Sequence, residues 1–174
     1  MSPKERLVAW LKGLGVAYEE VPSAEFKKEW RWLPDFFDAP FTSGLGIHWP
    51  YQRIIGVPGT GWPAILHEAG HLVATDGNLK TTNELVFLGW EWAVMQHLDL
   101  PQDEWLKSNS DYGIDGASAD AGSECCDTIG HLAHNPQALQ RVMAEMVSDA
   151  KRYGTITDDG TPVAHPNRRF EALR

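Results

Sequence analysis

The segment from Ala64 to Thr75 constrains the fold of this chain more than any other, because it reads as an apolar helix that carries polar side chains. Its sequence is Ala-Ile-Leu-His-Glu-Ala-Gly-His-Leu-Val-Ala-Thr. Pro63 suits a first helical position, where a missing backbone N–H costs nothing. Asp76-Gly77-Asn78 supplies a stop signal after the segment. The pattern therefore predicts a buried helix that begins near Pro63 and ends before Asp76.

Within this helix, His67-Glu68-x-x-His71 has the spacing of a zinc site. Consecutive helical residues are about 100° apart, so His67 and His71 lie one turn apart and can offer imidazole nitrogens to one metal ion. Glu68 lies about 100° round from His67, where its carboxylate can miss the metal and still reach a water bound to it. The motif predicts two ligands and one general base. The alternative is that both histidines only form hydrogen bonds in the core.

Length and composition predict one domain. With 174 residues and 43% hydrophobic content, the chain can bury a sizeable core. We expect a domain over residues 1–154 and a hairpin or extended tail over 155–174. A net charge of -9 argues against a nucleic-acid partner, and no apolar run approaches membrane-spanning length. The N-terminus is too polar for a signal segment, and Cys125 and Cys126 look like ordinary thiols, so a cytoplasmic protein is expected.

Capping signals and hydrophobic spacing predict the other elements. Ser2-Pro3-Lys4-Glu5 has the cap, the proline and the glutamate of a capping box, so a helix should begin there. This helix should end near residue 13 or 15. Before the motif helix we expect a strand over 16–21, a helix over 23–33, a loop over 35–46, and two short strands or a hairpin over 46–57. After it we expect a helix over 81–98, a long loop over 108–123, helices over 124–134 and 135–154, a hairpin over 155–163, and solvated arginines at 168 and 169.

A catalytic zinc normally takes three protein ligands and leaves a fourth position for water, so a third ligand is needed. The candidates beyond the motif are Asp76, Glu84, Glu91, His97 and Asp99. Asp76 is badly placed, because it lies about 140° round the helix from His71. Glu84 and Glu91 share one face of the helix predicted over 81–98, about 10.5 Å apart along its axis. Only one of them can therefore be level with the metal.

Glu91 is the better placed of the two glutamates. If the helix over 81–98 packs antiparallel against the motif helix, Glu91 lies opposite His67 and Glu84 lies opposite Ala74. Glu91 also stands in the apolar run 87–95, where a carboxylate without a partner would be costly. We therefore predict Glu91 as the third ligand and keep Glu84, a capping residue otherwise, as the reserve.

His67-Glu68-x-x-His71, followed twenty residues later by Glu91, resembles the gluzincin pattern of zinc metallopeptidases. The Arg53–Val57 run and the chain length resemble the ImmA/IrrE metallopeptidase family. The resemblance implies an α+β fold: a compact zincin-like domain with a small antiparallel sheet or hairpin packed on an active-site helix and a following ligand helix. It further implies a cytoplasmic protease that cleaves or derepresses a regulator in mobile elements or stress responses.

Two positions depart from related patterns. Gluzincins commonly carry an Asp four residues after the third ligand, which orients a ligand histidine, and Met95 stands there in this chain. Metzincins need a Gly and a third His where this chain has Ala74 and Gly77, so that class is excluded. The sequence does not choose an oxyanion donor among His131, His134, Tyr112 and Tyr153.

The sequence thus predicts a zinc-dependent peptidase. His67, His71 and Glu91 hold Zn2+, and Glu68 is the general base that activates a water against a peptide bond. The expected partner is a protein or peptide substrate, with no nucleic acid and no membrane, and the oligomeric state stays open. The alternatives are a catalytically silent, metal-stabilised regulatory protein of a mobile element and a hydrolase of non-peptide amides.

Overall fold

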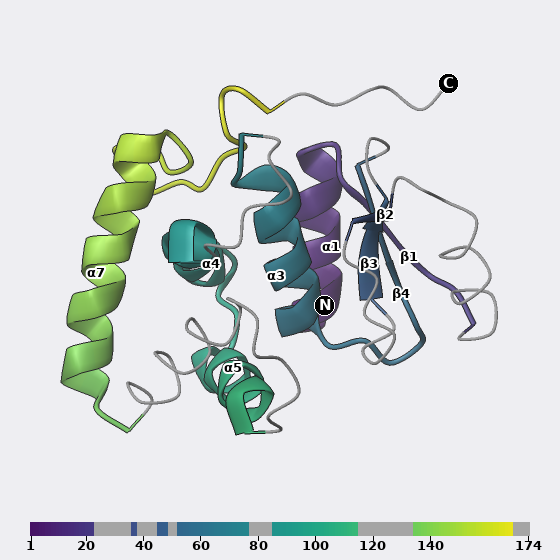
Figure 1. Cartoon of the computed structure of the whole chain (residues 1–174), viewed down its shortest axis with the longest axis horizontal. Coiled ribbons are helices and arrows are strands. Elements are labelled where there is room, and N and C mark those ends of the chain that lie inside the picture. Colours follow the sequence, from purple (N-terminus) through teal and green to yellow (C-terminus); the bar gives the residue numbers. More distant parts are fainter. Residues whose placement is uncertain (23–35, 38–44, 49–51, 77–84, 115–133, 169–174) are drawn as a thin grey trace. The chain divides into compact units, whose positions relative to one another are not determined.

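The computed structural model describes residues 1–22, 36–37, 45–48, 52–76, 85–114 and 134–168 of the chain (Figure 1). The chain divides into two compact units. The first comprises Met1–Leu79 and Asn167–Arg174, and the second comprises Lys80–Pro166. The second unit is therefore an insertion in the sequence of the first.

The first unit begins with helix α1, Pro3–Gly13, whose start is fixed by a reciprocal cap. The Ser2 hydroxyl accepts from the backbone N–H of Glu5 at 3.3 Å, and the Glu5 carboxylate accepts from the backbone N–H of Ser2 at 2.7 Å. The predicted capping box is confirmed, and the bond that the Ser2 backbone N–H donates to the carboxylate lowers the pKa of Glu5. Leu7 and Leu11 are one turn apart and are fully buried, so this face of the helix joins the core.

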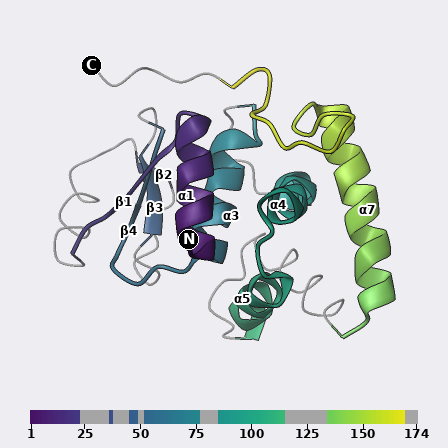
Figure 2. The ribbon, with the colours of Figure 1, turned by 180° about the vertical axis from the view of Figure 1, so that it is seen from behind.

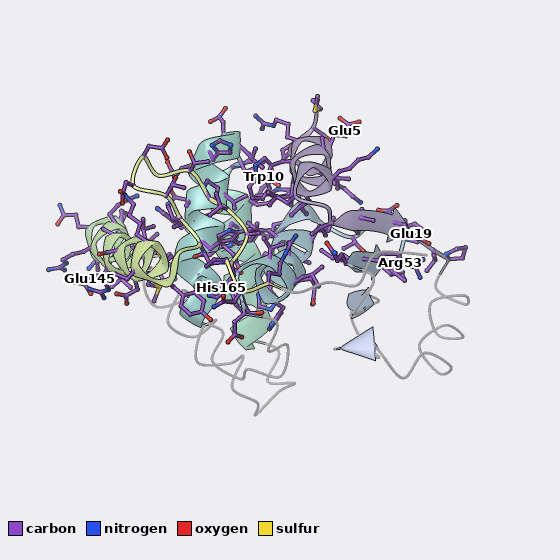
Figure 3. The ribbon with its side chains drawn as sticks, turned by 90° about the horizontal axis from the view of Figure 1, so that it is seen from above. Glu5, Trp10, Glu19, Arg53, Glu145 and His165 are labelled. Atoms are coloured by element: carbon purple, nitrogen blue, oxygen red, sulfur yellow. The ribbon has the colours of Figure 1, made fainter. Side chains whose placement is uncertain are left out.

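The first unit also contains a small mixed sheet with the strand order β1-β4-β3-β2. Strand β1, Ala17–Glu20, pairs in parallel with β4, Arg53–Gly56. Strand β3, Leu45–His48, pairs antiparallel with β4 on one side and with β2, Phe36–Phe37, on the other. Side chains of the adjacent strands β1 and β4 form an ion pair, in which Arg53 Nη1 lies 3.4 Å from Glu19 Oε2 (Figure 3). Ile54 and Ile55 of β4 are fully buried.

Helix α3, Trp62–Val73, is the predicted motif helix. Gly61 is its N-cap, Pro63 lies in its first turn, and Ala74 is its C-cap, as the proline and the stop signal indicated. Helices α1 and α3 lie next to one another on one side of the sheet (Figures 1 and 2). Most of α3 is buried, because its apolar residues face neighbours on several sides.

The second unit is helical. It contains α4, Leu85–Leu98, α5, Gln102–Ile114, and α7, Pro136–Tyr153, and α4 packs against α7. The Asn135 side chain caps α7 by accepting from the backbone N–H of Ala138 at 3.1 Å, and Gly154 ends the helix with a φ of 85°. The chain then turns back through a bridge between Ile156 and Pro162.

Three local predictions are wrong. The loop predicted over 35–46 contains strand β2 and the first two residues of β3, because a strand as short as β2 leaves too little alternation to read. The loop predicted from residue 108 is helical as far as Ile114. Arg168 is half-buried, and its guanidinium donates to the carbonyl oxygen of Leu14 at 2.7 Å, where burial lowers its pKa to about 10. The helix predicted over 23–33 and nearly all of that predicted over 124–134 lie outside the described residues.

The predicted α+β fold class is confirmed at the level of its composition from helices and strands. The prediction of a small antiparallel sheet or hairpin fits the pairing of β4 with β3 and of β3 with β2, but β1 joins the described sheet in parallel. A parallel partner cannot be read from one strand, since its register is set by a segment far away in the sequence. The zincin-like assignment and the boundary at residue 154 stay predictions. Within the described part of the chain, no helix has the length and apolar character needed to cross a membrane.

Candidate metal centre

Helix α3 brings the two histidines of the motif together. The ring centroids of His67 and His71 are 5.0 Å apart, and the rings are almost perpendicular, at 85°. This follows from local geometry, because residues four apart on a helix lie on the same face. His71 is only 2% exposed, whereas His67 is half-buried. The helix therefore places two imidazoles side by side on one face.

The surroundings of His71 keep its imidazole neutral. Burial, followed by the nearby His67, lowers the pKa of His71 to about 3. At neutral pH the ring therefore keeps a lone pair on one nitrogen, and a neutral imidazole is the form that binds a metal. The donor chemistry of this helix face fits a zinc ion, which favours imidazole nitrogens.

The last turn of α3 has an additional anchor that the sequence analysis did not identify. The hydroxyl of Thr75 donates to the backbone carbonyl oxygen of His71 at 2.6 Å, and Thr75 is 2% exposed. This carbonyl belongs to the helix end, where intrahelical donors run out. Thr75 thus fixes the backbone that carries His71. A threonine four residues after His71 on the same helix is the signal that would have revealed it.

Glu68 is the third polar residue on α3. It is 4% exposed and lies on a helix whose Ile65, Leu66 and Leu72 are fully buried. A buried carboxylate is costly unless its charge meets a partner or it takes up a proton and becomes neutral. Its position next to His67 in the sequence suits the role of a base beside a metal site.

The described candidates for the third ligand differ sharply in burial. Asp76, His97 and Asp99 are exposed, whereas Glu91 on α4 is completely buried. Glu84 lies outside the described residues. A carboxylate inside an apolar helix requires a structural or functional partner, so burial favours Glu91 over the exposed candidates.

Glu91 accepts a hydrogen bond that no sequence pattern indicated. Trp105 Nε1, on α5, donates to Glu91 Oε2 at 2.7 Å, and both residues are completely buried. The sequence prediction missed Trp105 because the start of α5 was not identified as a helix. Pro101 before the helix and Asp103 and Glu104 in its first turn are the signals that could have found it.

The structure does not select an oxyanion donor. His134 is exposed in a turn, and Tyr153 is 42% exposed, with its ring centroid 4.3 Å from that of His165. The side chain of Tyr112 and the whole of His131 lie outside what the structure describes. Met95, where gluzincins commonly carry an Asp, is a buried apolar residue of α4.

Among the described residues, no three His, Cys, Asp or Glu side chains form a group that could hold a metal ion. His67, Glu68 and His71 belong to the first unit, and Glu91 belongs to the second. Comparison of the chain with protein-family models, curated proteins and solved structures finds no match. The resemblance to ImmA/IrrE metallopeptidases therefore stays a prediction from the motif.

Proposed function

We propose that this chain is a zinc-dependent peptidase in which His67, His71 and Glu91 hold the metal and Glu68 is the general base. The observation that carries the proposal is the pair of imidazoles with centroids 5.0 Å apart on a buried helix, where His71 is held neutral. A buried histidine such as His71 is costly to fold without a ligand, and a metal ion offsets that cost. The complete burial of Glu91 supports its place as the third ligand.

The residues of this chain have distinct tasks in the proposed reaction. Bound zinc would act as a Lewis acid and make a water nucleophilic at neutral pH. Glu68 takes a proton from the attacking water and returns it to the amine that leaves, so the carboxylate ends as it began. His67 and His71 would hold the metal through imidazole nitrogens, and His71, which burial keeps neutral, would need no deprotonation. Glu68 and His71 are buried away from bulk water, which strengthens the electrostatic interactions there.

The finer features of the family belong to the same proposal. The first unit, with α3 beside a small sheet, would be the zincin-like part, and the substrate would be a protein or peptide. One observation favours the alternative of a catalytically silent, metal-stabilised regulatory protein. Met95 is apolar and 1% exposed, so α4 lacks the carboxylate that would orient a ligand histidine in an active gluzincin. Both functions need the metal, so metal binding is tested first.

The decisive experiment is metal content by mass spectrometry on protein purified without a histidine tag. We expect about one zinc per chain in the wild type, as a single catalytic site requires. Glu91→Gln, which keeps the size and the hydrogen-bond acceptor, should lose most of the metal. His97→Ala is the matched control, because His97 lies on the same helix but is exposed. A wild type without metal after incubation with zinc, or equal zinc in all three proteins, would overturn the proposed ligand set.

A further inference from the structure

We propose that Lys4 is the centre of a charged clamp that fixes the start of α3 from outside that helix. The clamp comprises Lys4 in the first turn of α1, Tyr18 and Glu20 of β1, and Thr60 in the loop between β4 and α3. All four residues belong to the first unit, and the clamp needs no metal. The beginnings of α1 and α3 lie at the same end of this unit (Figures 1 and 2).

The start of α3 has no side-chain cap among the described residues. Its N-cap is Gly61, which has no side chain that could accept from the backbone N–H groups of the first turn. The loop before it contributes little packing of its own, since a Cβ on Gly59 would meet nothing within 4 Å. The start of the helix therefore depends on contacts from other elements.

Lys4 provides such a contact through Thr60. The Lys4 ammonium donates to the backbone carbonyl oxygen of Thr60 at 2.9 Å. Within the loop, the backbone N–H and the hydroxyl of Thr60 both donate to the carbonyl oxygen of Val57, at 3.1 Å and 2.7 Å. The loop is thus a closed turn, and a charged donor binds the carbonyl just before the N-cap of α3. Such charge-assisted bonds are about twice as strong as neutral ones.

Two side chains of β1 hold the ammonium in place. Lys4 forms an ion pair with the Glu20 carboxylate, and its Nζ lies 5.3 Å from the centre of the Tyr18 ring. The Tyr18 hydroxyl donates at 3.0 Å to Glu20 Oε1, the oxygen that Lys4 also contacts. Burial, followed by this hydrogen bond, raises the pKa of Tyr18, so the phenol keeps its proton and remains a donor. The hydrogen bond from Lys4 lowers the pKa of Glu20, which keeps the carboxylate charged at neutral pH.

The positive charge of Lys4 is what joins these parts. A neutral side chain of similar length could fill the space, but it could neither donate to the Thr60 carbonyl nor pair with Glu20. The Lys4 and Glu20 side chains are 31% and 33% exposed, and ion pairs at such sites contribute little to global stability. Loss of the charge should therefore loosen the start of α3 locally and leave the rest of the protein folded.

The test is amide hydrogen exchange in the folded protein, resolved by residue with NMR. The amides of Thr60 and Ile65 report on the clamp, because their acceptors lie in the loop and at the N-cap of α3. Lys4→Met keeps an unbranched side chain and removes the charge, so exchange at these two amides should accelerate about fivefold, as for the loss of one hydrogen bond. The amide of Leu139, which is hydrogen-bonded at the start of α7, is the reference and should not change.

Three further variants test the role of the charge. Lys12→Met is the matched control, because Lys12 lies on the same helix and is exposed; exchange at both amides should stay near that of the wild type. Lys4→Arg keeps the charge and should remain closer to the wild type than Lys4→Met. Glu20→Gln releases the ammonium from the side of β1 and should also accelerate exchange. In the Lys4→Met background it should add little, since its partner is gone.

Unchanged exchange at Thr60 and Ile65 in Lys4→Met would overturn the clamp. Equal acceleration at Leu139 would also overturn it, because Lys4 would then stabilise the protein as a whole. If Lys4→Met does not fold by circular dichroism, Glu20→Gln allows the same comparison of amides. The experiment is done without added metal, so a failure of the clamp leaves the proposed peptidase intact, and a protein that binds no zinc leaves the clamp intact.

Discussion

Burial of Glu68 and His71 lowers the stability of the fold, but it also gives both side chains the properties that the proposed function needs. Glu68 is 4% exposed and His71 is 2% exposed. Burying these polar side chains costs folding free energy that apolar residues at the same positions would not cost. Burial holds His71 neutral, and a neutral imidazole can bind a metal whereas an imidazolium cannot. The same burial places the Glu68 carboxylate in surroundings of low dielectric constant, where a proton acceptor acts strongly. At these two residues, the features that disfavour folding are those that the proposed function needs.

The general-base role predicts that Glu68→Gln separates metal binding from turnover. The amide keeps the size of the side chain but cannot take a proton, so zinc content should be unchanged and peptide hydrolysis should fall about 10²- to 10⁴-fold. The measurement pairs metal analysis with mass-spectrometric profiling of a peptide library. Glu145→Gln on α7 is the control, because Glu145 is exposed and should tolerate the change. Undiminished hydrolysis by Glu68→Gln would rule out this mechanism.

The site was predictable from the sequence wherever one helix sets the geometry. The spacing of His67 and His71 fixes their relation through the helical repeat alone, so the pattern was sufficient. The bond from Trp105 to Glu91 joins two helices, and no periodicity reports the register between helices. The hydrogen bond from Thr75 was missed for a different reason. It is local, but the sequence analysis took the residue as part of the apolar run.

At the scale of elements, the packing of α4 against α7 depends on a glycine. A Cβ on Gly89 would overlap the carbonyl group of Met146 and would lie 2.8 Å from the backbone nitrogen of Val147. These are backbone atoms of the facing helix, which cannot rotate away as a side chain can. The two helices therefore approach as closely as they do because position 89 has no side chain.

Gly89→Ala should accordingly destabilise the protein, by roughly 3 kcal/mol, at the upper end of the cost of overpacking. The usual helical preference for Ala over Gly, about 1 kcal/mol, acts in the opposite direction and is too small to compensate. Urea unfolding followed by circular dichroism measures the difference. Gly13→Ala is the matched control, because a Cβ there meets nothing within 4 Å; it should be neutral or stabilising. Equal stabilities for the two variants would contradict the close approach.

Helix boundaries were predictable where capping residues mark them. The ends of α1, α3 and α7 follow from Ser2, Pro63, Asn135 and Gly154, whose effects are local. Helix α5 was missed because Ser, Asn, Asp and Gly, which are poor helix formers, fill its second half. Burial of Trp105 stabilises that helix from outside its own sequence, as tertiary packing often does. Strand β2 was missed because only its pairing with β3 defines it.

At the scale of the whole molecule, the chain leaves the first unit and later returns to it. The first unit takes Met1–Leu79 and Asn167–Arg174, and the second takes the residues between. The hydrogen bond from Arg168 to the Leu14 carbonyl joins the returning segment to the end of α1. Within the second unit, Trp90 Nε1 donates to the carbonyl oxygen of Val163 at 3.0 Å. This bond holds the segment around Val163 against α4. Each unit is thus closed by its own contact to the C-terminal stretch.

The proposed metal site predicts that zinc raises the thermal stability of the whole protein. A ligand that binds only the native state stabilises it by about 2.7 kcal/mol at a free concentration 100 times its dissociation constant. For a chain of this length, that corresponds to a rise in Tm of roughly 5 to 11 °C. Differential scanning calorimetry of chelator-treated protein, with and without zinc, measures the shift. Mg²⁺ should have little effect, because it prefers oxygen ligands, and a similar shift from zinc in His71→Ala would count against the site.

The bond between Arg168 and the Leu14 carbonyl also imposes an order of events on the ribosome. The two residues are 154 positions apart, so at about 5–20 residues per second the carbonyl is synthesised roughly 8 to 30 s before the guanidinium that donates to it. Every residue of the inserted unit is translated during that interval. The nascent chain therefore presents the inserted unit in full while the first unit still lacks this contact, and the unit that translation begins first is the one that it finishes last.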